Sequence, residues 1–181
     1  MILSVRKIYR VLFTILGLMA LSNQQVFGTE LVRHDTLKRE YLQLHINGKS
    51  HHRGENSSEL NEFNYGLGFT YNIGELISDT QLLNEAVFSI EADIYSDSFS
   101  ELGYVIGASF QKRLFKKLDW GVNIGLIHEQ NLQEKSGLYL FPYMVPYLQT
   151  NFDHPVNTRI LYIPPVHNTG GIFTAQLIVK F

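Results

Sequence analysis

Two short polar segments hold the side chains best suited to catalysis. One reads Lys-Ser-His-His-Arg and includes His51 and His52, and the other reads Tyr-Ser-Asp-Ser-Phe and includes Asp97 and Ser98. A histidine can accept a proton near neutral pH, a carboxylate can orient it, and a hydroxyl can attack an ester or donate to a developing oxyanion. These residue types predict acyl-transfer chemistry, provided that the fold brings the two segments together.

Simpler roles are open to the same residues. A pair of histidines in an exposed loop is most often only solvated, and Ser-Asp-Ser at a hairpin commonly forms a turn. A metal site would also need His45, which falls inside a predicted strand, and no fourth ligand is evident; we therefore expect no metal and no cofactor. Cysteine is absent, which excludes thiol catalysis and disulfide bonds.

The elements that would position these residues are strands, because apolar side chains recur with a period of two. Residues 64–73 show this most clearly, with an apolar or aromatic residue at every second position: Tyr65, Leu67, Phe69, Tyr71 and Ile73. Small or polar residues occupy the positions between them. Successive side chains of a strand point to opposite faces, so one face of this strand is apolar enough to contact lipid.

Further segments complete an all-β, eight-stranded antiparallel transmembrane β-barrel of the outer membrane. The same alternation appears around residue 90, and strands are predicted at 41–48, 103–111, 120–126, 141–150, 157–164 and 172–181. The last strand ends on Phe181, an aromatic C-terminus of the kind that outer-membrane barrels carry. A soluble barrel or sandwich would also alternate, but its apolar face would point inward.

The N-terminal region predicts export. Three cationic residues precede an apolar run over residues 11–21, which is short for a membrane-spanning helix and is followed by a plausible cleavage site. We expect a signal peptide at 1–28 and one barrel domain at 29–181, located in the outer membrane of a Gram-negative bacterium; an uncleaved anchor is the alternative. Lys and Arg number 15 and Asp and Glu 17, so the charge gives no reason to expect nucleic acid.

Barrel topology predicts where the polar segments meet. If the N-terminus lies in the periplasm, the first, third, fifth and seventh connections are extracellular, at residues 49–62, 96–102, 129–140 and 165–171. His52 lies in the first of these connections, and Asp97 and Ser98 lie in the second. Residues far apart in the sequence are therefore expected on one rim.

Four motifs together resemble the lipid A palmitoyltransferase (PagP) family. Residues 156–171 hold a Tyr-Ile-Pro followed by an Asn- and Gly-rich loop, as does the seventh strand of that family. Residues 95–99 resemble its aromatic-Lys-Asp-Ser-aromatic motif. Asn-Glu followed by Gly-Leu-Gly-Phe within 61–69 resembles its second strand, and Phe-Pro-Tyr-Met-Val-Pro at 141–146 resembles its sixth. The motifs keep the order of the family over residues 42–181.

The resemblance implies an enzyme that moves a palmitoyl chain from a phospholipid to a hydroxyacyl chain of lipid A at the outer leaflet. Carried over by motif, the functional residues are Asp97, Ser98 and a first-loop histidine, for which we choose His52 and keep His51 as the alternative. We expect His52, oriented by Asp97, to be the general base, and Ser98 to be an oxyanion donor or a transient nucleophile. One acyl chain would occupy an apolar barrel interior, and we expect a monomer.

Three further residues are predicted to contact the substrate. Pro142 and Pro164 would each remove a ladder N–H from neighbouring strands and open a lateral gap for acyl chains, although strand termination is the simpler role. Ser109 shares inward parity with Gly107 in its predicted strand. The resemblance places Ser109 where the family has a glycine at the end of the palmitoyl chain, which implies a pocket floor raised by about one methylene.

The sequence departs from the family in two respects. Residues 29–40 have a poor helical face where the family has an amphipathic helix, and the prolines near the first two strands are missing. A lipid A deacylase could use the same residue types, and a non-catalytic adhesin or structural barrel would need none of them. Acylation adds one chain to lipid A, deacylation removes one, and a structural barrel leaves lipid A unchanged.

Overall fold

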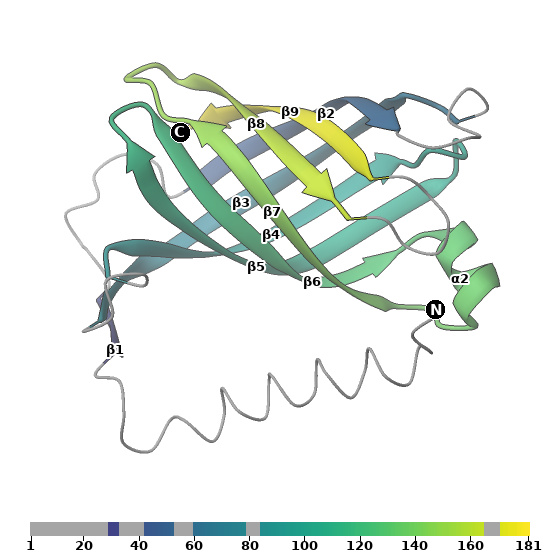
Figure 1. Cartoon of the computed structure of the whole chain (residues 1–181), viewed down its shortest axis with the longest axis horizontal. Helices are drawn as coiled ribbons and strands as arrows, with labels where there is room; N and C mark the ends of the chain where they lie inside the picture. The colour runs from purple at the N-terminus through teal and green to yellow at the C-terminus, as the bar shows by residue number, and fades with distance from the viewer. Residues whose placement is uncertain (1–28, 33–41, 53–59, 79–83, 165–170) are drawn as a thin grey trace.

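The computed structural model describes residues 29–32, 42–52, 60–78, 84–164 and 171–181, and these form a closed antiparallel β-barrel (Figure 1). Its strands are β2 (Leu42–His52), β3 (Phe63–Ser78), β4 (Ala86–Ser96), β5 (Leu102–Phe115), β6 (Leu118–His128), β7 (Phe141–Thr150), β8 (Val156–Ile163) and β9 (Ile172–Lys180). The ring runs β3, β2, β9, β8, β7, β6, β5, β4, and the pairing of β4 with β3 closes it. The all-β eight-stranded barrel predicted from the alternating pattern is confirmed.

Two short elements add to the eight strands of the ring, and neither was predicted. Strand β1 (Thr29–Val32) pairs with the end of β3, with Thr29 opposite Ser78. Helix α2 (Gln130–Ser136) lies in the connection between β6 and β7, and none of the helices in the described part of the chain is long and apolar enough to cross a membrane. Residues 1–28, where a signal peptide is expected, lie outside the described residues.

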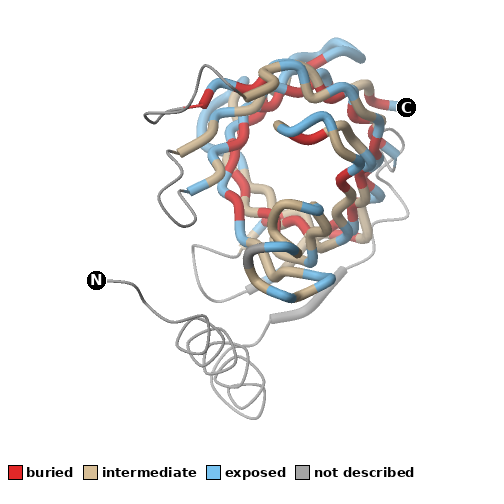
Figure 2. Tube along the Cα trace, turned by 90° about the vertical axis from the view of Figure 1, so that its right-hand side faces the viewer, coloured by how far each residue is buried: buried red, intermediate tan, exposed pale blue. Residues whose placement is uncertain are grey.

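The outer surface of the barrel is an apolar belt. Along β3, the residues that point outward and are exposed are Tyr65, Leu67, Phe69 and Tyr71, as their spacing predicted. Strands β4, β5, β6 and β9 alternate in the predicted sense, and Figure 2 shows buried and exposed residues alternating around the ring. An apolar outer face on a closed antiparallel barrel is the architecture of outer-membrane proteins.

Strand β2 continues beyond this belt. It extends to His52, so both histidines of the predicted loop 49–62 belong to the strand. The side chains of Lys49 and His51 are 62% and 66% exposed, and both lie 3.4 Å from the Glu62 carboxylate. Outward charges are costly at hydrocarbon depth, so residues 49–52 stand above the membrane-spanning part of β2.

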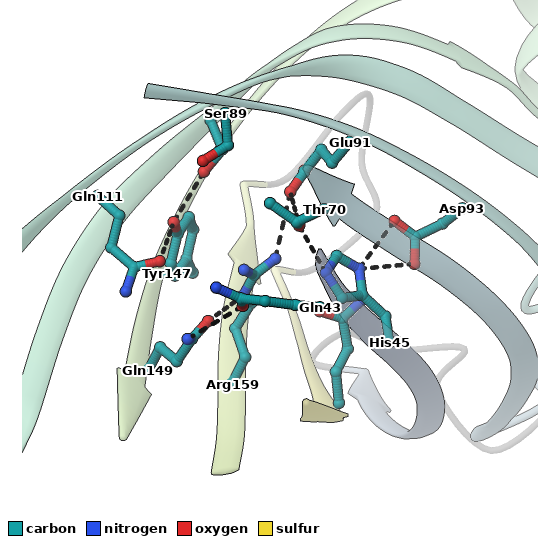
Figure 3. A network of polar contacts seen from close by, with 12 residues as sticks. Gln43, His45, Thr70, Ser89, Glu91, Asp93, Gln111, Tyr147, Gln149 and Arg159 are labelled. Carbon is teal, nitrogen blue, oxygen red and sulfur yellow. Dashed lines mark hydrogen bonds and ion pairs between the residues drawn. The ribbon is translucent and has the colours of Figure 1, made fainter. Parts of the chain in front are cut away.

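The barrel interior is filled mostly by polar side chains. Arg159 and Glu91 form an ion pair at 3.2 Å with both side chains at most 2% exposed. Arg159 also donates to Gln149 at 2.8 Å, and its guanidinium lies 4.3 Å from the ring centre of Tyr147 (Figure 3). A buried charge is tolerated only when it is paired and hydrogen-bonded, so these contacts allow charged groups inside the barrel.

A second part of this interior network is centred on His45, which is fully buried. One ring nitrogen of His45 lies 3.2 Å from the Asp93 carboxylate and the other lies 2.7 Å from the Thr70 hydroxyl (Figure 3). Gly68 faces Asp93 across the β3–β4 ladder, and a Cβ at Gly68 would collide with the Asp93 carboxylate. We call Gln43, His45, Thr70, Glu91, Asp93, Gln149 and Arg159 the polar plug. The apolar interior expected for an acyl chain is therefore absent at the level of the plug.

Candidate functional site

A cavity of about 300 Å³ lies between the polar plug and the outer rim. Apolar side chains from α2, β7 and β8 make much of its wall, namely Leu132, Phe141, Val145, Leu161 and Ile163. His52 and Ser98 line it at the rim, and Glu91 and Asp93 line it at the plug. Its volume is at the low end of the range for small-molecule sites, and its lining changes from apolar to polar with depth.

The barrel wall is open beside this cavity. Strands β7 and β8 pair only from Tyr147 opposite Leu161 to Gln149 opposite Arg159, although both strands continue toward the rim. Met144 is 58% exposed on the outside and also lines the cavity. The cavity therefore reaches the lipid-facing surface between these two strands.

Prolines explain why the pairing stops. Pro142 and Pro146 of β7 face Leu126 and Val122 of β6. Because proline has no N–H, Pro142 and Pro146 cannot form hydrogen-bonded pairs with β6. In an antiparallel ladder, the N and C=O of such residues point to the strand on the other side, which here is β8. The edge of β7 that faces β8 thus lacks two donors. Pro142 and Pro164, for which the sequence predicted a lateral gap, line the cavity, whereas the sequence predicted no role for Pro146, which starts the unpaired stretch.

The structure brings His52 and Ser98 together. The Ser98 hydroxyl lies 3.0 Å from Nε2 of His52, and the Ser50 hydroxyl lies 3.3 Å from the same nitrogen. The backbone N–H of Asn61 donates to the Ser98 carbonyl at 2.8 Å. His51 points outward, so geometry selects His52 from the histidine pair. Ser50 and Asn61 lie in motifs that the sequence singled out, but no role was predicted for either; the inward parity that Ser50 shares with His52 was the available signal.

Asp97 does not orient His52 among the described contacts. Its Oδ1 accepts the backbone N–H groups of Phe99 and Glu101, both at 2.8 Å, and its buried Oδ2 has no partner among the described residues. The carboxylate therefore stabilises the turn that carries Ser98, because an aspartate side chain commonly accepts backbone N–H groups of residues that closely follow it. Asp97 is a positioning residue for the serine, whereas the sequence predicted a contact with the histidine.

The surroundings of His52 favour its neutral form. Partial burial lowers the pKa of His52 below its ordinary value, and the Asn61 backbone contact and the Glu62 charge only partly oppose this shift. At neutral pH the imidazole is therefore neutral, and Nε2 can accept the proton of the Ser98 hydroxyl. A base with an adjacent hydroxyl is the arrangement that nucleophilic acyl transfer requires.

Tyr95 and Glu129 form a second polar pair at the cavity mouth. The Tyr95 hydroxyl donates to the Glu129 carboxylate at 2.7 Å, and both residues line the cavity. Burial raises the pKa of Glu129, and the nearby Asp97 charge acts in the same direction, while the Tyr95 hydrogen bond opposes them. The pair joins the end of β4 to the loop that carries α2. Tyr95 lies in the motif at residues 95–99, but the sequence predicted no role for Tyr95 or Glu129.

Ser109 lies deeper than the cavity. It points inward and is 1% exposed, as its parity predicted, but its hydroxyl bonds to the Tyr147 hydroxyl at 2.8 Å and it does not line the cavity. The cavity ends instead at Glu91, Asp93 and Asn123. The described residues include no group of three or more His, Asp or Glu side chains placed to hold a metal ion.

No protein-family model matches the sequence, and no curated protein matches it. Among solved structures, the chain is similar to the outer membrane protein Ail of Yersinia pestis, determined in a phospholipid bilayer nanodisc. The sequence identity is 12%, the TM-score is 0.42, and the alignment covers 78% of this chain and 99% of Ail. A similarity of this size says nothing about the function of the present chain.

Proposed function

We propose that this protein is an outer-membrane acyltransferase that moves an acyl chain from a phospholipid to a hydroxyacyl chain of lipid A, as the PagP resemblance implies. The observation that carries the proposal is the 3.0 Å contact between the Ser98 hydroxyl and Nε2 of His52 at the mouth of a cavity. A hydroxyl bonded to a neutral imidazole is an activated nucleophile, and the cavity beside it offers an apolar wall for an acyl chain.

The proposed reaction has two halves. Ser98 Oγ attacks the phospholipid ester carbonyl and gives its proton to Nε2 of His52; the lysophospholipid oxygen then leaves with that proton, and an acyl-Ser98 remains. In the second half, His52 takes the proton of the lipid A hydroxyl, which attacks acyl-Ser98. The returning proton restores the Ser98 hydroxyl, so atoms and charge balance without a cofactor.

The acyl chain reaches Ser98 through the gap between β7 and β8 in this proposal. Both Pro142 and Pro164 line the cavity beside that gap, and the outward Met144 borders it. An apolar chain can follow Phe141, Val145 and Leu161, but the polar plug limits its depth because burying methylenes against charged groups gains no hydrophobic free energy. The chain therefore lies in the upper part of the barrel.

A lipid A deacylase remains the second candidate, because the first half-reaction is the same. If the acyl-Ser98 formed from lipid A and water took the place of the hydroxyl acceptor, lipid A would lose a chain. The identity of the acceptor separates these activities, and the mass of lipid A reports it directly.

The test is mass spectrometry of lipid A from Gram-negative cells that express the wild-type protein, Ser98→Ala, His52→Ala or His51→Ala. We expect one added acyl chain with wild type and with His51→Ala, and a loss of about a hundredfold or more in rate with the other two variants. Folding is checked by comparing the gel mobility of heated and unheated samples of each variant. Removal of a chain would identify a deacylase, and an unchanged lipid A with folded wild-type protein would exclude both enzymes.

A further inference from the structure

The deep end of the cavity carries hydrogen-bond acceptors that no described residue satisfies. Oδ1 of Asn123, Oε1 of Gln176 and the hydroxyl oxygen of Tyr143 are buried and have no partner within the described part of the chain. Asn123 is 3% exposed and Gln176 is 8% exposed, and all three residues line the cavity. Buried polar atoms are nearly always hydrogen-bonded, so three such atoms without a described partner, on residues that line the same cavity, indicate a ligand.

The orientation of the Gln176 side-chain amide is determined by its neighbours. Asp93 offers only acceptor oxygens, so Asn47 must present its NH₂ group to Asp93, at 3.3 Å. The Asn47 carbonyl then accepts the NH₂ group of Gln176. This chain of amides leaves Oε1 of Gln176, a residue that lines the cavity, as an acceptor without a described partner. The ligand group at this point must therefore be a donor.

The charges at this end of the cavity favour a cation. Glu91 and Asp93 line the cavity, and the described lining residues include no Lys or Arg. Arg159 neutralises Glu91 through their 3.2 Å contact, whereas the partners of Asp93 within the described part of the chain are the His45 ring and the Asn47 amide. A ligand with donors and a positive charge would satisfy the three unmatched acceptors beside Asp93.

We propose that the deep end of the cavity binds the primary ammonium group of a small amphiphilic amine, with its alkyl part along the apolar wall. The ammonium has three donors and no acceptor, which matches the three acceptors of Tyr143, Asn123 and Gln176. Val145 and Leu161 line the same cavity and suit an alkyl chain. The site shares the apolar wall of Val145 and Leu161 with the proposed acyl chain, but its three polar residues take no part in the bond-making steps proposed for Ser98 and His52.

The test uses hexylammonium as the probe and compares it with hexanol and hexanoate, which share its chain. Binding is measured by calorimetry on the folded full-length barrel in phosphatidylcholine nanodiscs, with empty nanodiscs subtracted. We expect hexylammonium to bind about tenfold or more tightly than hexanol, as for a hydrogen bond to a charged group, and hexanoate to bind more weakly still. Equal affinity for hexylammonium and hexanol would overturn the proposal.

Two tyrosines of β7 provide matched variants. The Tyr143 hydroxyl has no described partner, so Tyr143→Phe should leave stability unchanged while weakening hexylammonium binding about tenfold. The Tyr147 hydroxyl bonds to Ser109 and Gln111 and does not line the cavity, so Tyr147→Phe should lower stability and keep the affinity. Asn123→Leu should behave like Tyr143→Phe. Wild-type affinity in Tyr143→Phe and in folded Asn123→Leu would refute the site.

Discussion

The half of the barrel interior at the polar plug and the half nearer the rim differ in two respects. They differ in whether their buried polar atoms have hydrogen-bond partners and in whether strands β7 and β8 pair. At the level of the plug, β7 pairs with β8, and Arg159 contacts Glu91, Gln149 and the Tyr147 ring, with only its Nη2 lacking a described partner. Toward the rim, β7 and β8 separate, and the cavity is bordered by unmatched polar atoms. Tyr147 and Tyr143 show the contrast within one strand, since among the described residues the first hydroxyl has two partners and the second has none.

The groups at the plug therefore serve mainly the stability of the fold, and the groups nearer the rim are available to a ligand. A barrel in lipid must satisfy its own backbone and buried charges, and the plug does so with side chains from several strands. A site that binds or transforms a ligand must keep such groups free, so it departs from the rules that stabilise the rest of the fold. Substitutions in the plug should therefore change the free energy of unfolding, and substitutions above it should change turnover or binding.

The largest expected effect is on the plug. Arg159→Ala leaves the buried Glu91 carboxylate without its cation and should lower the free energy of unfolding by about 3 to 5 kcal/mol. Urea titration of the barrel in lipid vesicles measures this loss. The double variant Glu91→Leu with Arg159→Met, which removes both charges, should recover much of the stability. If Arg159→Ala were as stable as wild type, the plug would not be the stabilising half.

The next effect concerns the gap between β7 and β8. If the pairing of Tyr147 with Leu161 is continued by one residue toward the rim, Pro146 lies beside Tyr162. Because the chain has no cysteine, cysteines introduced at these positions have no native thiol to react with. A disulfide or short bismaleimide link between Pro146→Cys and Tyr162→Cys should slow acyl transfer about a hundredfold, with recovery when a disulfide is reduced. A link between Leu148→Cys and Ile160→Cys, which are already paired, is the control and should have no effect. Full activity with the first link would exclude access through this gap.

A smaller effect distinguishes the two roles considered for Asp97. Asp97→Ala removes the acceptor that holds the backbone N–H groups of Phe99 and Glu101, so Ser98 should lose its position and transfer should fall about tenfold or more. Asp97→Asn keeps an oxygen at Oδ1 and should retain most activity. If Asp97→Asn lost as much activity as Asp97→Ala, the carboxylate charge would be acting on His52 after all. Rates are measured with phospholipid donor and lipid A in mixed micelles.

The smallest effect is on the pH profile of acyl transfer. In the proposed reaction His52 acts as a base only when it is neutral, and its pKa is lowered by burial, so the rate should rise with pH through a midpoint below about 6.5. The Glu62 charge raises the pKa of His52, so Glu62→Gln should move this midpoint to still lower pH. A midpoint above 6.5, or a shift to higher pH in Glu62→Gln, would contradict the assignment of His52 as the base.

Much of the fold follows from local pattern, but the site follows only in part. Alternation in residues 64–73 predicted the strand and its outward face because a strand has a strict two-residue period. Alternation does not report where a strand ends, so β2 was predicted four residues too short and His52 was placed in a loop. Residue types in the Ser-Asp-Ser segment identified Ser98, but they could not show that Asp97 would bind the backbone of its own turn instead of the histidine.

The sequence by itself determined the closed barrel and its apolar outer face, because side-chain period is a local property, and the motif resemblance named His52 and Ser98 as candidates on one rim. Only the tertiary structure decided what fills the interior. Glu91 and Arg159 are 68 positions apart, and His45 and Asp93 are 48 apart, so no local pattern indicates that they meet. Ring closure and strand register bring them together, and that register makes one half of the interior a polar plug and leaves the other half open as a cavity.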